Sequence, residues 1–133
     1  MAAEEREVLA ANAAFYEAFA ERDMEGMDAL WSRRDDVACV HPGWEGISGR
    51  SGVMTSWRSI LEGPAPPAIA CAQERVYLLG DVALVICVET IPNGELMATN
   101  VFVRESGRWR MVHHHAGPIA TGVDDESPPE LLN

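Results

Sequence analysis

Apolar side chains recur at three- and four-residue spacing in the first half of the chain and alternate with polar ones in the second half. The first period is that of an amphipathic helix and the second that of a half-buried strand. The helical pattern predicts helices over residues 4–21, just after Asp23 as an N-cap, and over 51–61. A short strand is expected over 37–41, between the second and third helices.

The alternating half of the chain predicts four strands joined by tight turns. These strands cover residues 69–78, 82–90, 95–104 and 108–115. The pairs between them, Gly80-Asp81, Asn93-Gly94 and Ser106-Gly107, are residue types that favour two-residue hairpins. Three helices followed by consecutive hairpins predict an α+β fold, in which a curved antiparallel sheet packs on the N-terminal helices.

Two-residue turns at Asn93-Gly94 and Ser106-Gly107 also predict which residues face each other across the strands. This register places polar side chains in two rows on one face of the sheet. The rows are Cys87, Asn100 and His113, and Glu89, Ala98 and His115. We expect this polar face to lie beneath the helices and to line a pocket.

The opposite face of the expected sheet is aliphatic. It collects Leu84, Ile86, Val88, Val101, Val103 and Val112. Three helices cover only one face of a sheet, and contiguous exposed apolar surface usually marks an association site. We therefore expect a homodimer that forms through the aliphatic face.

The composition limits which partners and which cellular compartment are expected for this protein. A net charge of −11 argues against binding to nucleic acid, because that affinity comes from Lys and Arg that neutralise phosphates. No apolar run approaches the ~20 residues of a membrane-spanning helix, so no membrane partner is expected. Three cysteines without metal-type spacing favour a reducing, cytoplasmic location. One domain is expected over residues 1–120, followed by an acidic, mobile tail over 121–133.

The histidines are the first candidates for chemistry, because an imidazole exchanges protons near neutral pH. His113 and His115 share a strand face and are candidate acid/base groups, with Asn100 as a donor that polarises a carbonyl or holds an enolate. His41 is the next candidate, and Glu89 is a candidate orienting group. The alternative is that these are buried polar residues satisfied by their neighbours. A metal site of His113 and His115 with His41 or Glu89 has no spacing signature, so neither a metal nor a cofactor is expected.

Aromatic and sulfur-containing side chains predict an apolar wall around these polar groups, of the kind that small organic ligands need. The candidates are Phe15, Tyr16, Trp44, Trp57, Cys87, Phe102 and Met111. Trp44 stands in a glycine-rich loop, where a large aromatic side chain is unfavourable unless it covers something, so we expect it to form a lid. For Phe15 and Trp57, ordinary core packing is favoured over a place in this wall.

Three parts of the chain resemble the NTF2-like superfamily and, within it, the SnoaL-like branch. FYEAFAERDMEGMDALW (15–31) is similar to the paired opening helices of that family. HPGWEG (41–46) with GRSGVMTSW (49–57) resembles its loop and third helix, and NVFVRESGRWRMVHHH (100–115) resembles its closing hairpin. The resemblance implies a cystatin-like α+β cone, a fold that carries isomerases, cyclases, dehydratases, transport adaptors and accessory domains.

Ketosteroid isomerases of this superfamily use a carboxylate base on the first strand, with a Tyr and a protonated Asp as oxyanion donors. The positions that resemble these hold His41, Phe15 (with Tyr16 beside it) and Asn100. The isomerase set is therefore replaced at each position, although Asn100 still donates a hydrogen bond.

The resemblance and the candidate residues together lead to two expected functions. The first is a SnoaL-like protein that binds a small, largely apolar organic molecule in the cone, with or without cofactor-free acid/base catalysis of the isomerase, cyclase or dehydratase type. The second is a non-catalytic dimeric association or ligand-sensing module.

Overall fold

The computed structural model describes residues 2–64 and 68–120, so the expected tail over 121–133 lies outside the described residues. The described elements are α1 (Ala3–Ala20), α2 (Met24–Leu30), β1 (Ala38–Val40), β2 (Ile47–Ser48), α3 (Arg50–Leu61), β3 (Ala70–Leu79), β4 (Val82–Ile91), β5 (Gly94–Glu105) and β6 (Arg108–Pro118). The predicted α+β class, with a curved sheet and three helices, is confirmed. The two-residue strand β2 was not predicted from the pattern.

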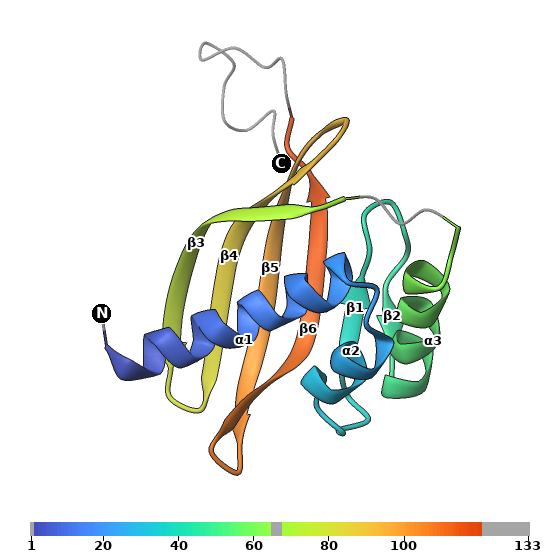
Figure 1. The fold of residues 1–133 in the computed structure, drawn as a ribbon. Helices are drawn as coiled ribbons and strands as arrows, with labels where there is room; N and C mark the ends of the chain where they lie inside the picture. Colours follow the sequence, from blue (N-terminus) through green and yellow to red (C-terminus); the bar gives the residue numbers. More distant parts are fainter. Residues whose placement is uncertain (1, 65–67, 121–133) are drawn as a thin grey trace.

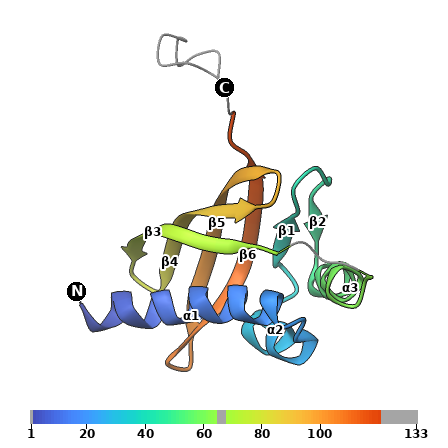
Figure 2. The ribbon, with the colours of Figure 1, turned by 45° about the horizontal axis from the view of Figure 1, so that its top comes forward.

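The strands of the described chain form one sheet in the order β2-β1-β6-β5-β4-β3. Neighbouring strands pair antiparallel, except that β1 lies parallel to β6. Helix α1 crosses the concave side of β3 to β6, and α2 and α3 lie beside β1 and β2 (Figure 1, Figure 2). The sheet and α1 therefore enclose a cone whose inner surface is the core.

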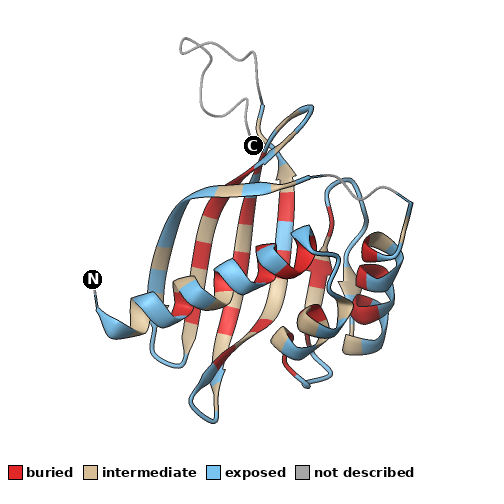
Figure 3. Ribbon diagram, in the orientation of Figure 1, coloured by how far each residue is buried: buried red, intermediate tan, exposed pale blue. Residues whose placement is uncertain are grey.

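The inner face of the sheet and one side of α1 are buried against each other (Figure 3). Burial alternates along β4 and β5, as expected for strands with one face on the core. Helix α1 contributes Val8, Phe15 and Phe19 to this core, and Asn12 and Tyr16 are buried on the same side. A helix that buries two polar side chains in an apolar core needs partners for them on the sheet.

The second helix begins as predicted, because the Asp23 side chain accepts a hydrogen bond from the backbone N–H of Gly26 at 3.0 Å. This satisfies one of the backbone N–H groups that have no partner in the first turn of a helix.

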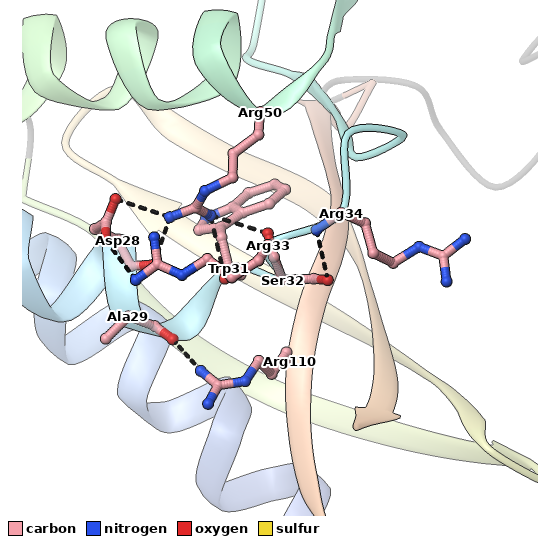
Figure 4. Close-up of polar contacts among 8 residues, drawn as sticks. All are labelled: Asp28, Ala29, Trp31, Ser32, Arg33, Arg34, Arg50 and Arg110. Atoms are coloured by element: carbon pink, nitrogen blue, oxygen red, sulfur yellow. Dashed lines mark hydrogen bonds and ion pairs between the residues drawn. The ribbon is translucent and has the colours of Figure 1, made fainter. Parts of the chain in front are cut away.

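Arg50, the first residue of α3, fastens that helix to the end of α2. Its guanidinium donates hydrogen bonds to the backbone oxygens of Trp31, Ser32 and Asp28, at 3.2, 2.9 and 3.1 Å (Figure 4). It also pairs with the Asp28 carboxylate at 2.8 Å. The end of a helix leaves carbonyl groups without partners and favours a cation there. The Arg50 guanidinium provides both hydrogen-bond donors for these carbonyl groups and a positive charge, and so it positions α3 beside β1.

The turn between β4 and β5 differs from the prediction. Ile91 pairs with Gly94, so the central residues of the turn are Pro92 and Asn93 rather than Asn93 and Gly94. Proline favours the first central position of a turn, because its ring holds φ near about −65°. This preference of Pro92 outweighs the hairpin preference of Asn93-Gly94.

The different turn shifts the register of β4 against β5 by two residues. Cys87 faces Ala98 instead of Asn100, and Glu89 faces Leu96 instead of Ala98. A shift of two residues keeps every side chain on its own face of the sheet. Cys87, Glu89 and Asn100 therefore remain on the inner face, as predicted.

A bulge in β6 has a larger effect. The pairing of β5 with β6 begins as predicted, with Phe102 opposite Met111, but the next residue, Val101, pairs with His113. One extra residue in β6 reverses the faces of all residues beyond it.

The bulge makes the predicted placement of two histidines wrong. Asn100 lies opposite His114, not His113, and His114 is 3% exposed. His113 and His115 lie on the outer face, where their ring centres are 6.2 Å apart. His113 Nδ1 donates there to the backbone oxygen of Ala38 at 3.0 Å.

The part of the outer face formed by β4 and β5 is apolar, as predicted, and no described helix covers it (Figure 2). Leu84, Ile86, Val101 and Val103 are half-buried on this face. Among the described helices, none is both long enough and apolar enough to cross a bilayer.

Candidate functional site

A cavity of about 240 Å³ lies where the C-terminal half of α1, helix α3 and the ends of β4 and β5 meet. Its lining is mostly aromatic and aliphatic, with a few polar groups among them, which is the character of a small-molecule site. The lining residues are Phe15, Tyr16, Phe19, His41, Pro42, Trp44, Trp57, Ile60, Ile69, Glu89, Ile91, Leu96 and His114.

Glu89 is the one carboxyl group in this described lining, and it is 2% exposed. The Tyr16 hydroxyl donates a hydrogen bond to Glu89 Oε2 at 2.6 Å. Burial raises the pKa of Glu89, and burial together with the nearby carboxyl raises the pKa of Tyr16. A carboxyl group whose pKa is raised toward neutrality is suited to both take up and release a proton.

Asn100 holds the polar side of the cavity together, although it is fully buried and does not line the cavity. Its Nδ2 donates to Asn12 Oδ1 at 2.8 Å and to the Tyr16 hydroxyl at 3.2 Å. Its Oδ1 accepts from His114 Nδ1 at 2.6 Å. One amide therefore joins α1 to β5 and β6 and orients both Tyr16 and His114.

The hydrogen bonds also determine the tautomers of the two cavity histidines. Asn100 Oδ1 can only accept, so His114 carries its proton on Nδ1 and its lone pair on Nε2. No hydrogen bond to His114 Nε2 is found among the described residues. Ser56 Oγ donates to the backbone oxygen of Val53 at 2.7 Å and so accepts from His41 Nε2 at 2.9 Å.

Both imidazoles are neutral at neutral pH. Burial lowers the pKa of His41 to about 4 and that of His114, which also lies near other histidines, to about 3. Neither ring is protonated enough to act as a general acid near pH ~7. Glu89 is therefore better matched to proton exchange than either histidine.

Aromatic rings form most of the wall. Trp57 contacts Phe15 and Phe19 edge to face, with ring centres 5.3 and 5.8 Å apart, and His41 lies 4.6 Å from Trp57. Trp44 lines the cavity while 47% of it is exposed, which places it at the rim. Whether Trp44 closes over a bound molecule stays a prediction.

The structure brings part of the predicted set to the cavity. Phe15, Tyr16, His41, Trp44, Trp57 and Glu89 line it. Cys87, Phe102 and Met111 are 0% exposed in the core and do not line it, and His113 and His115 lie on the outer face. The alternative metal set of His113 and His115 with His41 or Glu89 is thus divided between the two faces. Within residues 2–64 and 68–120, no group of three His, Cys, Asp or Glu side chains is arranged to hold a metal.

Two residues of the site, His114 and Asn12, are not among the candidates from the sequence. A strand that turns His113 and His115 inward would turn His114 outward, and the bulge reverses this placement. Asn12 stands four residues before Tyr16 on the apolar side of α1. Two polar residues at helical spacing within an apolar stripe are a signal of a buried hydrogen-bond network.

Comparison with known proteins places this site in a family. The family model of the SnoaL-like domain matches residues 8–121. The chain belongs to the SnoaL-like domain family. It is also 30% identical over 123 residues to the F-box protein SKIP8 of Arabidopsis thaliana, a match that covers 91% of this chain and 52% of SKIP8. The chain thus spans about half the length of this curated relative.

Solved structures agree with the family. An NTF2-like family protein from Streptomyces avermitilis, suggested to be a dehydratase, is 34% identical with a TM-score of 0.80, over 87% of this chain and 96% of that one. A protein from Thiobacillus denitrificans, suggested to be a calcium/calmodulin-dependent protein kinase type II association domain, is 37% identical with a TM-score of 0.76, over 83% and 93%. A protein of unknown function from Nostoc punctiforme, with a cystatin-like fold, shares 16% identity and a TM-score of 0.75, over 91% and 95%, and so shows the fold alone. The predicted NTF2-like, cystatin-like fold is confirmed.

Replacing Asn100 by Ala should destabilise the fold by about 3 kcal/mol, because it leaves buried partners on three sides unsatisfied. Urea unfolding measures this change. Asn93→Ala, the same substitution at an exposed turn residue, is the control and should cost under about 0.5 kcal/mol. An Asn100→Ala cost no larger than that of the control would contradict the central role of this amide.

Acidification should destabilise the protein through His41 and His114. In the unfolded chain each imidazole takes up a proton near pH ~6.5, whereas the folded chain resists protonation down to about 4 and about 3. The free energy of unfolding should therefore fall below pH ~6.5, by up to about 1.4 kcal/mol per pH unit for each histidine.

Glu89 acts in the opposite sense, because its raised pKa favours the folded state as the pH falls. The slope is therefore measured by urea unfolding between about pH 7 and about pH 5 in the Glu89→Gln background. Adding His114→Gln should reduce the slope by about a third to a half, because His41 and His113, whose pKa burial also lowers, keep their contributions. An unchanged slope would show that His114 is not buried in its neutral form.

Proposed function

We propose that this SnoaL-like protein binds a small, largely apolar organic molecule in the cavity and that Glu89 exchanges a proton with it without a cofactor. The observation that supports this proposal most directly is the burial of the Glu89 carboxyl group in the cavity wall. Glu89 is 2% exposed, in the wall of an otherwise apolar cavity, with a raised pKa. Its one hydrogen bond among the described residues comes from Tyr16.

The roles follow from the hydrogen bonds. As a base, the Glu89 carboxylate takes a proton from the bound molecule, and Tyr16, which donates to Oε2, stabilises the carboxylate before the transfer. As an acid, the carboxyl returns the proton to another atom, as in isomerisation, or to a leaving hydroxyl, as in dehydration. His114 Nε2 is a second acceptor whose orientation is set by Asn100.

The family and its solved structures support this class of function. The Streptomyces avermitilis protein, at 34% identity, is one for which a dehydratase activity has been suggested. The isomerase, cyclase and dehydratase types share the step described here, a proton transfer within a closed apolar cavity.

A cytoplasmic location stays a prediction.

The uncovered outer face favours a second candidate, an association module. Four of its apolar residues are only half-buried within one chain, namely Leu84, Ile86, Val101 and Val103. Leu79 and Met97 beside them are 61% and 45% exposed. The Thiobacillus denitrificans protein, at 37% identity, is one suggested to be an association domain. A homodimer through this face is compatible with ligand binding, because the cavity lies on the other side of the sheet.

Filling the cavity should abolish ligand binding without unfolding the protein. Ile60 is half-buried and lines the cavity, so Ile60→Trp places an indole in it. Cyclohexanone, a compact and largely apolar ketone, should bind the unaltered protein and not this variant, as measured by NMR titration. Ser59→Trp, at the exposed neighbouring position, should bind as the unaltered protein does. Equal binding to both variants would place the ligand elsewhere.

The complex with cyclohexanone also allows proton transfer to be measured. In D₂O, the protein should speed deuterium incorporation next to the carbonyl of cyclohexanone, and Glu89→Gln should reduce that rate by about 100-fold or more. Binding with no Glu89-dependent exchange would leave a binding protein without catalysis.

A dimer through the outer face should be sensitive to a buried charge. Native mass spectrometry should give twice the mass of one chain, and Ile86→Glu, on the aliphatic face, should give one chain. Ser59→Glu adds the same charge on α3 and should leave the dimer intact. A monomer of the unaltered protein at high concentration would refute the interface.

A further inference from the structure

The charge character of the cavity restricts what it can bind. None of its described lining residues is Arg or Lys. The two lining imidazoles are neutral near neutral pH, because burial lowers the pKa of His41 to about 4 and that of His114 to about 3. Tyr16 stays protonated because its pKa is raised. Glu89 is therefore the one lining group that can carry a charge, and that charge is negative.

Glu89 is also poorly satisfied as a carboxylate. Two carboxylate oxygens accept about four hydrogen bonds, whereas the described residues supply one, from Tyr16. A buried carboxylate with so few donors requires either a proton or a cation beside it. Burial raises the pKa of Glu89, so the empty cavity stabilises the protonated form more than water does. A cation bound beside Glu89 would instead stabilise the carboxylate.

The aromatic lining of the cavity is a second reason to expect a positively charged ligand. Five aromatic side chains line the same cavity: Phe15, Tyr16, Phe19, Trp44 and Trp57. The faces of aromatic rings are electronegative and attract ammonium groups, most strongly in a site from which water is excluded. The volume of about 240 Å³ lies below the ~300–1,000 Å³ of pockets for drug-sized ligands. The site therefore fits a compact ligand.

We infer that the ligand is a compact apolar amine, bound as its ammonium ion with the nitrogen beside Glu89 and the body against the aromatic wall. This inference rests on the proposed function, because it names the class of molecule that the cavity takes. Glu89 then binds the ammonium as its carboxylate, the form in which it takes a proton from the bound molecule in the proposed function. Carboxylates and phosphates are excluded, since no lining group offers them a positive charge.

Three probes with one shape and different charge test this inference. Benzylamine, benzyl alcohol and benzoate are nearly the same size and are cationic, neutral and anionic at neutral pH. Benzylamine should bind the unaltered protein about 10- to 100-fold more tightly than benzyl alcohol, the range of a charge-assisted hydrogen bond. Benzoate should not bind. Isothermal titration calorimetry measures all three affinities.

Variants test whether Glu89 causes the preference for benzylamine over benzyl alcohol. Glu89→Gln should bind benzylamine and benzyl alcohol equally, because the amide keeps the shape of the side chain and removes its charge. Glu17→Gln removes the same charge from the exposed residue next to Tyr16 and should keep the preference. Ile60→Trp should abolish binding of both probes. The ranking of the probes on the unaltered protein requires no variant, so the test stands even if Glu89→Gln does not fold.

The outcomes separate this inference from the proposed function. If benzyl alcohol binds at least as tightly as benzylamine and Ile60→Trp blocks it, the amine is ruled out while the apolar cavity remains a binding site. An amine preference that survives Glu89→Gln also overturns the inference. If neither these probes nor cyclohexanone binds, both proposals fall.

Discussion

The Asn100 amide is the interaction on which the rest of this structure depends. Helix α1 buries Asn12 and Tyr16 on a side that is otherwise apolar, and such burial is favourable only if both side chains find partners. Asn100 donates to both, at 2.8 and 3.2 Å. The position of α1 across the sheet, and with it the roof of the cavity, is therefore coupled to one fully buried side chain.

The bulge in β6 completes the same network from the other side. Without the extra residue, His113 would lie opposite Asn100 and His114 would lie on the outer face. With it, His114 Nδ1 donates to the one Asn100 atom that the helix leaves free. Donors and acceptors are thus matched across α1, β5 and β6, and the lone pair of His114 Nε2 is left without a partner among the described residues.

The same fold occurs in proteins for which different functions have been suggested. Proteins suggested to be a dehydratase and an association domain share this fold at 34% and 37% identity, so the fold by itself does not decide the chemistry. What decides it is the lining of the cone. In this chain the lining combines one buried carboxyl, two neutral imidazoles and five aromatic rings, which favours positive charge over negative charge in a bound molecule.

The sequence by itself determined whatever depends on local structure. The helical periods, the Asp23 cap, the strands and the apolar outer face all follow from residues close together in the chain, and Glu89 stayed on its predicted face because a two-residue shift preserves the alternation of a strand. The SnoaL-like fold was also recognisable from three segments of sequence.

Only the tertiary structure decided the contacts of the site. Pro92 prevailed over Asn93-Gly94 at the turn, and the bulge at Val112 carries no local signal such as a glycine. Tyr16 and Glu89 are 73 residues apart in the chain, yet their oxygens lie 2.6 Å apart. Such contacts depend on the register of several strands at once, and one inserted residue in a strand is enough to exchange the histidine that enters the cone.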